Sequence, residues 1–153
     1  MVGKIKIQII SNYSVLLLML FASMSEQLIA QNNEFDRYLE IGHKHMKNEE
    51  YDKAATYFLK AYEQDPYDIN AVQSLATAYI FGGNYKKSEK YFLEVIILDP
   101  TDYNAYYNLS CIHSVRSNEE LALKYLEKSF IFGYVDHKHI MNDSDLEFIR
   151  AKE

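Results

Sequence analysis

The chain has 153 residues, and its 48% hydrophobic content is that of a folded domain with a buried core. Its formal net charge of −6 argues against nucleic acid or anionic lipid as the main partner, because binding phosphate requires a basic surface. Cys111 is the only cysteine, which excludes an intrachain disulfide and an all-cysteine metal site.

Residues 1–30 have the three parts of a secretory signal peptide. The start carries Lys4 and Lys6, an apolar stretch runs from Val15 to Met24, and Ala30 suits a cleavage site, although Leu28 is large for its position. The stretch is shorter than the roughly 20 residues that cross a bilayer. We expect cleavage near Ala30. The alternatives are a buried first helix and an uncleaved anchor, which would be the only part of the chain to contact a membrane.

The rest of the chain aligns with itself after a shift of 34 residues. "DPYDINA" (65–71) then falls on "DPTDYNA" (99–105), and each unit has two apolar stripes with the spacing of amphipathic helices. Large residues fill the space between the helices, whereas small ones let the helices approach closely. The coinciding columns include Tyr38, Val72 and Tyr106; Ile41, Leu75 and Leu109; Gly42, Ala76 and Ser110; Ala54, Ser88 and Ala122; and Phe58, Phe92 and Leu126.

The joints between the units carry helix stop and start signals. Pro66 and Pro100 are predicted to follow the ends of helices, because proline lacks the N–H that a helix needs. Asp68 and Asp102 come next, where an N-cap of the following helix is expected. Since one unit cannot bury both of its faces, the units must stack on one another.

These columns resemble the tetratricopeptide repeat, a helix–turn–helix unit with Leu-Gly in its first helix and Ala, Phe, Ala and Pro in its second. The matching segments are 35–68, 69–102 and 103–136, although the third has Tyr134 instead of the closing proline. The resemblance implies an all-α fold, a right-handed α-solenoid of three helix–turn–helix repeats.

The C-terminal residues 137–153 are predicted to cap the solenoid. "DSDLE", from Asp143 to Glu147, resembles the closing motif of bacterial repeat arrays, where a capping helix covers the last repeat. The resemblance implies a bacterial source, so an exported chain would be periplasmic or extracellular.

The resemblance also implies that the first helices line a concave groove that binds extended peptides or partner helices. Amide and hydroxyl groups there can bond to a peptide backbone, and Tyr107 is a candidate hot spot. We therefore expect a scaffold whose groove binds a protein or peptide partner. The alternatives are that another face binds the partner, or that the groove binds no ligand tightly. The predicted groove residues are Asp36, Leu39, His43, Asn70, Gln73, Thr77, Asn104, Tyr107, Asn108 and Cys111.

One related subfamily binds the C-terminal carboxylate of chaperones through a clamp of Lys, Asn, Asn, Lys and Arg. No cation remains at the corresponding positions, so an acidic tail is not the expected ligand. Those positions are Leu39, His43, Ser74, Asn104 and Asn108.

The sequence predicts no catalytic residue, no cofactor and no metal site. Cys111 and His113 are two residues apart and point about 200° apart on a helix, so they cannot form a nucleophile–base pair. His137 and His139 have the same awkward spacing, and the acids around them are better explained as N-caps. A metal-binding or enzyme accessory protein, or a membrane-anchored assembly subunit, is the alternative to an exported, non-enzymatic scaffold.

Overall fold

The computed structural model describes the backbone of residues 2–151 and the side chains of residues 17–151. Within this range the regular secondary structure consists of helices, without a strand. The chain divides into two units, Met1–Arg37 and Tyr38–Glu153.

The first unit consists of most of helix α1, Val2–Lys47, which ends in the second unit. Large apolar side chains between Leu17 and Ile29 are exposed, with exposed fractions from 53% to 69%. No helix in the described part of the chain is both long enough and apolar enough to cross a membrane. The side chains of Lys4, Lys6 and Val15 lie outside the described residues. The cleaved signal peptide and its alternatives therefore stay predictions.

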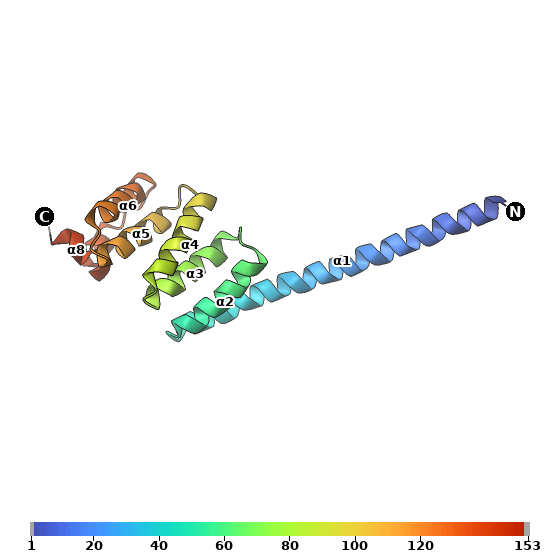
Figure 1. The fold of residues 1–153 in the computed structure, drawn as a ribbon, viewed down its shortest axis with the longest axis horizontal. Helices are drawn as coiled ribbons and strands as arrows, with labels where there is room; N and C mark the ends of the chain where they lie inside the picture. Colours follow the sequence, from blue (N-terminus) through green and yellow to red (C-terminus); the bar gives the residue numbers. More distant parts are fainter. Residues whose placement is uncertain (1, 152–153) are drawn as a thin grey trace. The chain divides into compact units, whose positions relative to one another are not determined.

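The second unit is a solenoid in which each helix packs on the next, from α2 to α6. In Figure 1 these helices follow one another in chain order, from green to red. Buried side chains from neighbouring helices, among them Phe58, Phe92 and Leu109, form one continuous core. The predicted all-α solenoid is confirmed. Its helices are α2 (Tyr51–Gln64), α3 (Ile69–Phe81), α4 (Tyr85–Leu98), α5 (Tyr103–Val115) and α6 (Glu119–Ile131).

The helices of a repeat cross at the predicted columns of small residues. In the second repeat the Ser88 hydroxyl on α4 donates to the carbonyl oxygen of Ala76 on α3, at 2.7 Å. In the third repeat the Ser110 hydroxyl on α5 donates to the carbonyl oxygen of Ala122 on α6, at 2.8 Å. All four residues are buried, so each bond satisfies a hydroxyl that water cannot reach.

The joints have the predicted stop and start signals. Helices α2 and α4 each end two residues before their proline. The carboxylate of Asp68 accepts a hydrogen bond from the backbone N–H of Ala71 at 2.8 Å, and that of Asp102 from Ala105 at 2.6 Å. The two N-cap predictions are thus confirmed.

The end of the chain folds onto the third repeat as three short helices: α7 (His137–Asn142), η1 (Ser144–Leu146) and α8 (Glu147–Arg150). We call residues 137–150 the C-terminal cap. Its buried side chains Ile140, Leu146 and Ile149 pack in one cluster with residues of α5 and α6. The predicted cap is present, although it is built from three short helices instead of one. Residues 152–153 of the predicted segment lie outside the described residues.

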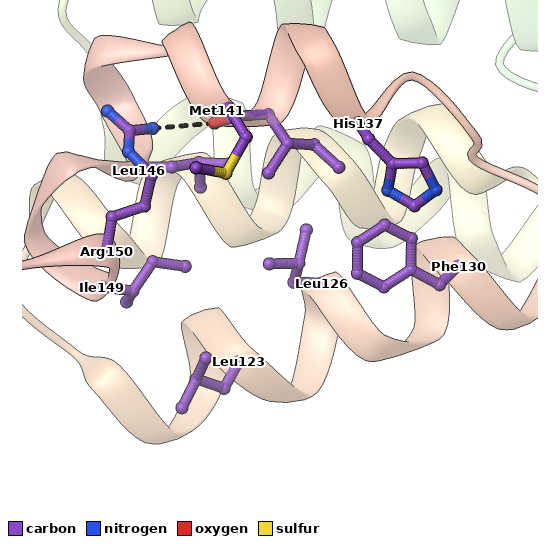
Figure 2. A pocket seen from close by; sticks show the side chains of 9 residues that line it. Leu123, Leu126, Phe130, His137, Met141, Leu146, Ile149 and Arg150 are labelled. Carbon is purple, nitrogen blue, oxygen red and sulfur yellow. Dashed lines mark hydrogen bonds between the residues drawn. The ribbon is translucent and has the colours of Figure 1, made fainter. Parts of the chain in front are cut away.

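Hydrogen bonds hold the cap in shape. The Asp136 carboxylate caps α7 by accepting from the N–H of His139 at 2.8 Å, as the sequence predicted. The Arg150 guanidinium donates to the carbonyl oxygens of Ile140 and Asp143, at 2.8 and 2.5 Å. Figure 2 shows Arg150 and its hydrogen bond at one end of an apolar pocket between the cap and α6.

Candidate peptide-binding groove

The ten predicted groove residues lie on α1, α3 and α5, the first helices of the three repeats. Eight of them are at least partly accessible. Asp36 belongs to the first unit and is described only as an exposed residue of α1. The exposed ones are Asp36, His43, Asn70 and Asn104, and the half-buried ones are Leu39, Gln73, Thr77 and Asn108.

Three of the predicted residues come together in a pocket of about 290 Å³ between α1, α2 and α3. Phe58 is fully buried and, with Met46, provides the apolar part of the wall. The exposed His43 ring meets the Phe58 ring edge-on, with centroids 5.0 Å apart. The pocket thus combines an apolar wall with a polar rim. Its full lining is His43, Met46, Phe58, Gln73, Ser74 and Thr77.

The polar side chains of the pocket have unused hydrogen-bonding capacity. The amide nitrogen of Gln73 donates to the carboxylate of Asp102 at 2.5 Å, which orients the side chain and leaves its oxygen as an acceptor. Within the described part of the chain, the hydroxyls of Ser74 and Thr77 have no hydrogen-bond partner. Three polar groups are therefore available to a ligand in this pocket.

The sequence did not single out Met46 and treated Phe58 as a core residue only. Met46 lies three residues after His43 on α1, and helical spacing of this kind could have placed it on the groove face. Asn108 uses its amide nitrogen to donate to the carbonyl oxygen of Asn104 at 2.8 Å, which leaves fewer donors on α5 than the sequence suggested.

The structure corrects the prediction for Tyr107 and Cys111, which are buried and do not line an open groove. The Tyr107 ring stacks on Tyr134, with centroids 4.4 Å apart, and its hydroxyl donates to the carboxylate of Asp143 at 2.5 Å. The Cys111 thiol is 3.7 Å from the same carboxylate. The C-terminal cap covers this part of α5, so the open groove is shorter than three repeats.

Cys111 and His113 face different neighbours. Burial raises the pKa of the Cys111 thiol, and the charge of Asp143 adds to this effect. The His113 ring stacks on Tyr125, with centroids 5.4 Å apart, and its Nε2 is 3.4 Å from Glu89 of α4. Burial lowers the pKa of His113. A protonated thiol that faces the cap and an imidazole that faces α4 do not form a nucleophile–base pair.

Comparison with known families finds one match, to a family described as tetratricopeptide repeat, over residues 45–110. The comparison with curated proteins found no match. Solved structures show the same fold at low sequence identity. The first TPR domain of Spaghetti (RPAP3), bound to the HSP90 peptide SRMEEVD, has a TM-score of 0.69 at 20% identity. The match covers 78% of this chain and 93% of that one.

YrrB, described as a TPR protein with an unusual peptide-binding site, has a TM-score of 0.65 at 24% identity. The match covers 70% of this chain and 55% of YrrB, so this chain spans about half of the YrrB length. The Yersinia enterocolitica type III secretion chaperone SycD, in complex with a peptide of the translocator YopD, has a TM-score of 0.66 at 14% identity. That match covers 76% of this chain and 92% of SycD.

Proposed function

We propose that this chain, which matches the tetratricopeptide-repeat family over residues 45–110, is a non-enzymatic scaffold that binds an extended peptide segment of a protein partner. The observation that carries the proposal is the pocket between α1, α2 and α3, with its apolar wall and its available polar groups. Similar structures are described with bound peptides, which supports a peptide as the ligand class.

The pocket has the composition of an anchor site for one side chain. At about 290 Å³ it is at the lower end of the size of ligand pockets, which run from about 300 Å³ upwards. Half-buried Met46 would contact an apolar side chain of the ligand, and the buried Phe58 ring would support this wall from the core. The hydroxyls of Ser74 and Thr77 and the oxygen of Gln73 would bond to the neighbouring peptide groups.

The charge of the groove restricts the ligand. The accessible groove positions on α1, α3 and α5 carry amides, a hydroxyl, a histidine, a leucine and the carboxylate of Asp36, but neither lysine nor arginine. A terminal carboxylate would therefore lose its hydration without gaining a cationic partner, which is unfavourable. We propose that the ligand is held by its backbone and one apolar side chain, and that a terminal carboxylate plays no part.

The test is selection from a random peptide library displayed on phage, followed by calorimetric titration of the enriched peptide. Thr77→Arg, which fills the pocket with a long side chain, is expected to weaken binding at least tenfold. Thr56→Arg makes the same change at an exposed position on α2 and is the matched control. If no peptide is enriched, or if both variants bind the peptide like the wild type, the groove is not the binding site.

We also propose that the chain is exported by a bacterium and acts in the periplasm or outside the cell, after cleavage near Ala30. The exposed apolar side chains between Leu17 and Ile29 support this proposal, because an apolar surface of this kind is usually covered or removed. The intact mass of the protein from its native envelope is the test. A mass for residues 31–153 supports cleavage, whereas the full-length mass in the membrane fraction would favour a membrane-anchored subunit.

A further inference from the structure

A second group of polar side chains lies where the C-terminal cap meets α5, separate from the proposed peptide site. Cys111, Asp143 and Asp145 each offer one possible ligand atom, and these three atoms lie within 4.8 Å of one another. The Cys111 sulfur is 3.7 Å from Oδ2 of Asp143. Nε2 of His139, which is not one of these three groups, lies 3.6 Å from the same oxygen. Helices α5 and η1 and the residue between α7 and η1 thus bring together a thiol and two carboxylates, and α7 places an imidazole beside them.

We propose that Cys111, Asp143 and Asp145 bind a divalent transition-metal ion, for which zinc is the reference ion, and that the exposed ring of His139 turns toward the ion as the fourth ligand. Zinc takes sulfur, nitrogen and carboxylate ligands at about 2.0–2.3 Å in a tetrahedral arrangement. Two ligand atoms of such a tetrahedron are therefore about 3.3–3.8 Å apart. The distances from Oδ2 of Asp143 to the Cys111 sulfur and to Nε2 of His139, 3.7 and 3.6 Å, fall in this range, and the imidazole has to move closer to the other ligands to complete the tetrahedron.

A buried hydroxyl without a partner provides a second and independent observation. Ser114 lies three residues after Cys111 on α5, is fully buried and forms no side-chain hydrogen bond in the described part of the chain. Ser114 and Asp145 both line an open pocket of about 510 Å³ between the end of α5 and the cap. This pocket gives an ion a route from solvent as far as Asp145, and a water molecule bound to the ion would satisfy the Ser114 hydroxyl.

The charges around the cluster favour a cation. Among the described residues, no lysine or arginine side chain forms a salt bridge with Asp143 or Asp145. The nearby guanidinium of Arg150 donates to the backbone carbonyls of Ile140 and Asp143. A divalent ion would offset the repulsion between the two carboxylates and tie α5 to the cap. Tyr107, which donates to Asp143, would orient this ligand from outside the coordination sphere.

The structure also separates the two histidines that the sequence considered together. His137 packs on the Phe130 ring, with centroids 5.9 Å apart, and lines the apolar pocket between the cap and α6. Figure 2 shows His137 beside Phe130 in this pocket. His139 instead contacts Tyr107 and Asp143. His137 is therefore a matched control for His139 in any metal-binding experiment.

The experiment titrates zinc into the metal-free full-length chain by calorimetry, and cobalt by absorption spectroscopy. We expect one ion per chain and a thiolate-to-cobalt charge-transfer band, since Cys111 would bind as a thiolate and release its proton to solvent. Cys111→Ser should abolish the band, and Asp145→Asn and His139→Gln should each weaken zinc binding at least tenfold. His137→Gln should bind zinc like the wild type.

Two further measurements keep the proposal testable if a variant is destabilised. Circular dichroism of each metal-free variant shows whether it is folded, and the melting temperature with and without zinc shows whether the ion binds the folded state. Zinc should raise the melting temperature of the wild type and of His137→Gln, and chelation should reverse the rise. The proposal is overturned if binding is substoichiometric, if folded Cys111→Ser retains the affinity of the wild type, or if both histidine variants lose zinc equally.

Discussion

Gly42 lies so close to Phe58 that a Cβ atom on Gly42 would come within 2.5 Å of Cε1 of the phenyl ring. The ring is fully buried in the core and also provides a wall of the candidate groove, so it has little room to move. The crossing of α1 and α2 and the shape of the pocket therefore depend on the same contact.

The first prediction concerns this contact. Gly42→Ala should destabilise the fold, because overpacking a core costs about 1–3 kcal/mol, which exceeds the gain of up to about 1 kcal/mol that alanine has over glycine in a helix. Urea unfolding measures the change. Combining it with Phe58→Leu, which makes space, should cost less than the sum of the two single changes. Strict additivity would contradict the contact.

The second prediction concerns the middle of the stack. Phe92 is 2% exposed and packs within the continuous core, so Phe92→Ala should cost about 3–5 kcal/mol. This is a large part of the stability of a small domain, and the variant should be close to global unfolding at room temperature. Thermal melts measure the loss. Ile97→Ala on the same helix is the control, since Ile97 is 76% exposed; an equal effect of both changes would be inconsistent with the stacking described.

The third prediction concerns the turn between α1 and α2. Hydrogen bonds from Lys53 and then from His45 lower the pKa of Glu50 from 4.5 to about 2. Because the pKa is lower in the folded state, the contribution of Glu50 to stability is present above about pH 4.5 and is lost as the pH falls towards 2. NMR titration of the carboxyl group should show Glu50 still ionised at about pH 3.5, below the ordinary glutamate pKa of 4.5 and above its own pKa of about 2.

A lysine substitution tests the cause of this shift. Lys53→Met should raise the pKa of Glu50 towards 4.5, because it removes the largest cause. Lys60→Met is the control, since Lys60 lies over the rings of Tyr38 and Tyr57 instead. If both variants leave the titration of Glu50 unchanged, the Lys53 contact does not form in solution.

The fourth prediction concerns the C-terminal cap. Leu146 is a fully buried side chain of the cap, and Leu146→Ala should weaken the docking of the cap on α5 and α6 by about 2–5 kcal/mol. The single cysteine reports the opening, because Cys111 is 4% exposed in the docked state. In the presence of a chelator, a thiol reagent should label the variant much faster than the wild type. Met141→Ala, at a position that is 67% exposed, should label like the wild type; equal rates for all three proteins would mean that Cys111 is reached by another route.

The sequence predicted best those features that are local or periodic. The N-cap at Asp68 needs only Ala71, three residues away, and the columns of buried residues recur every 34 residues, so both could be found without coordinates. The prediction for Tyr107 did not hold, because its periodicity assigns it to the groove face but does not show whether that face is open. Its partner Asp143 is 36 residues away, in a segment outside the repeat pattern.

The repeat pattern predicted only part of the lining of the pocket between α1, α2 and α3. Gln73 and Thr77 belong to the columns that the pattern assigns to the groove, and both line the pocket. Met46 and Phe58 were not assigned to the pocket. A periodic pattern sorts residues into core positions and groove positions, whereas these two residues lie at the boundary and belong to both the core and the groove. The metal-binding cluster could not be predicted, because Cys111 and Asp143 meet only after the cap has folded onto α5.

The hydrogen bonds at the helix crossings have a consequence for how such repeats diverge. The donor is on the second helix in one repeat (Ser88) and on the first helix in the next (Ser110), and in both cases the acceptor is the backbone of the residue at the partner position, twelve residues away. After a duplication, the serine can therefore change helices while the interaction is retained. In related proteins, substitutions at these two positions should therefore occur in pairs. Conservation that is scored for each alignment column separately would miss this hydrogen bond, although the bond persists.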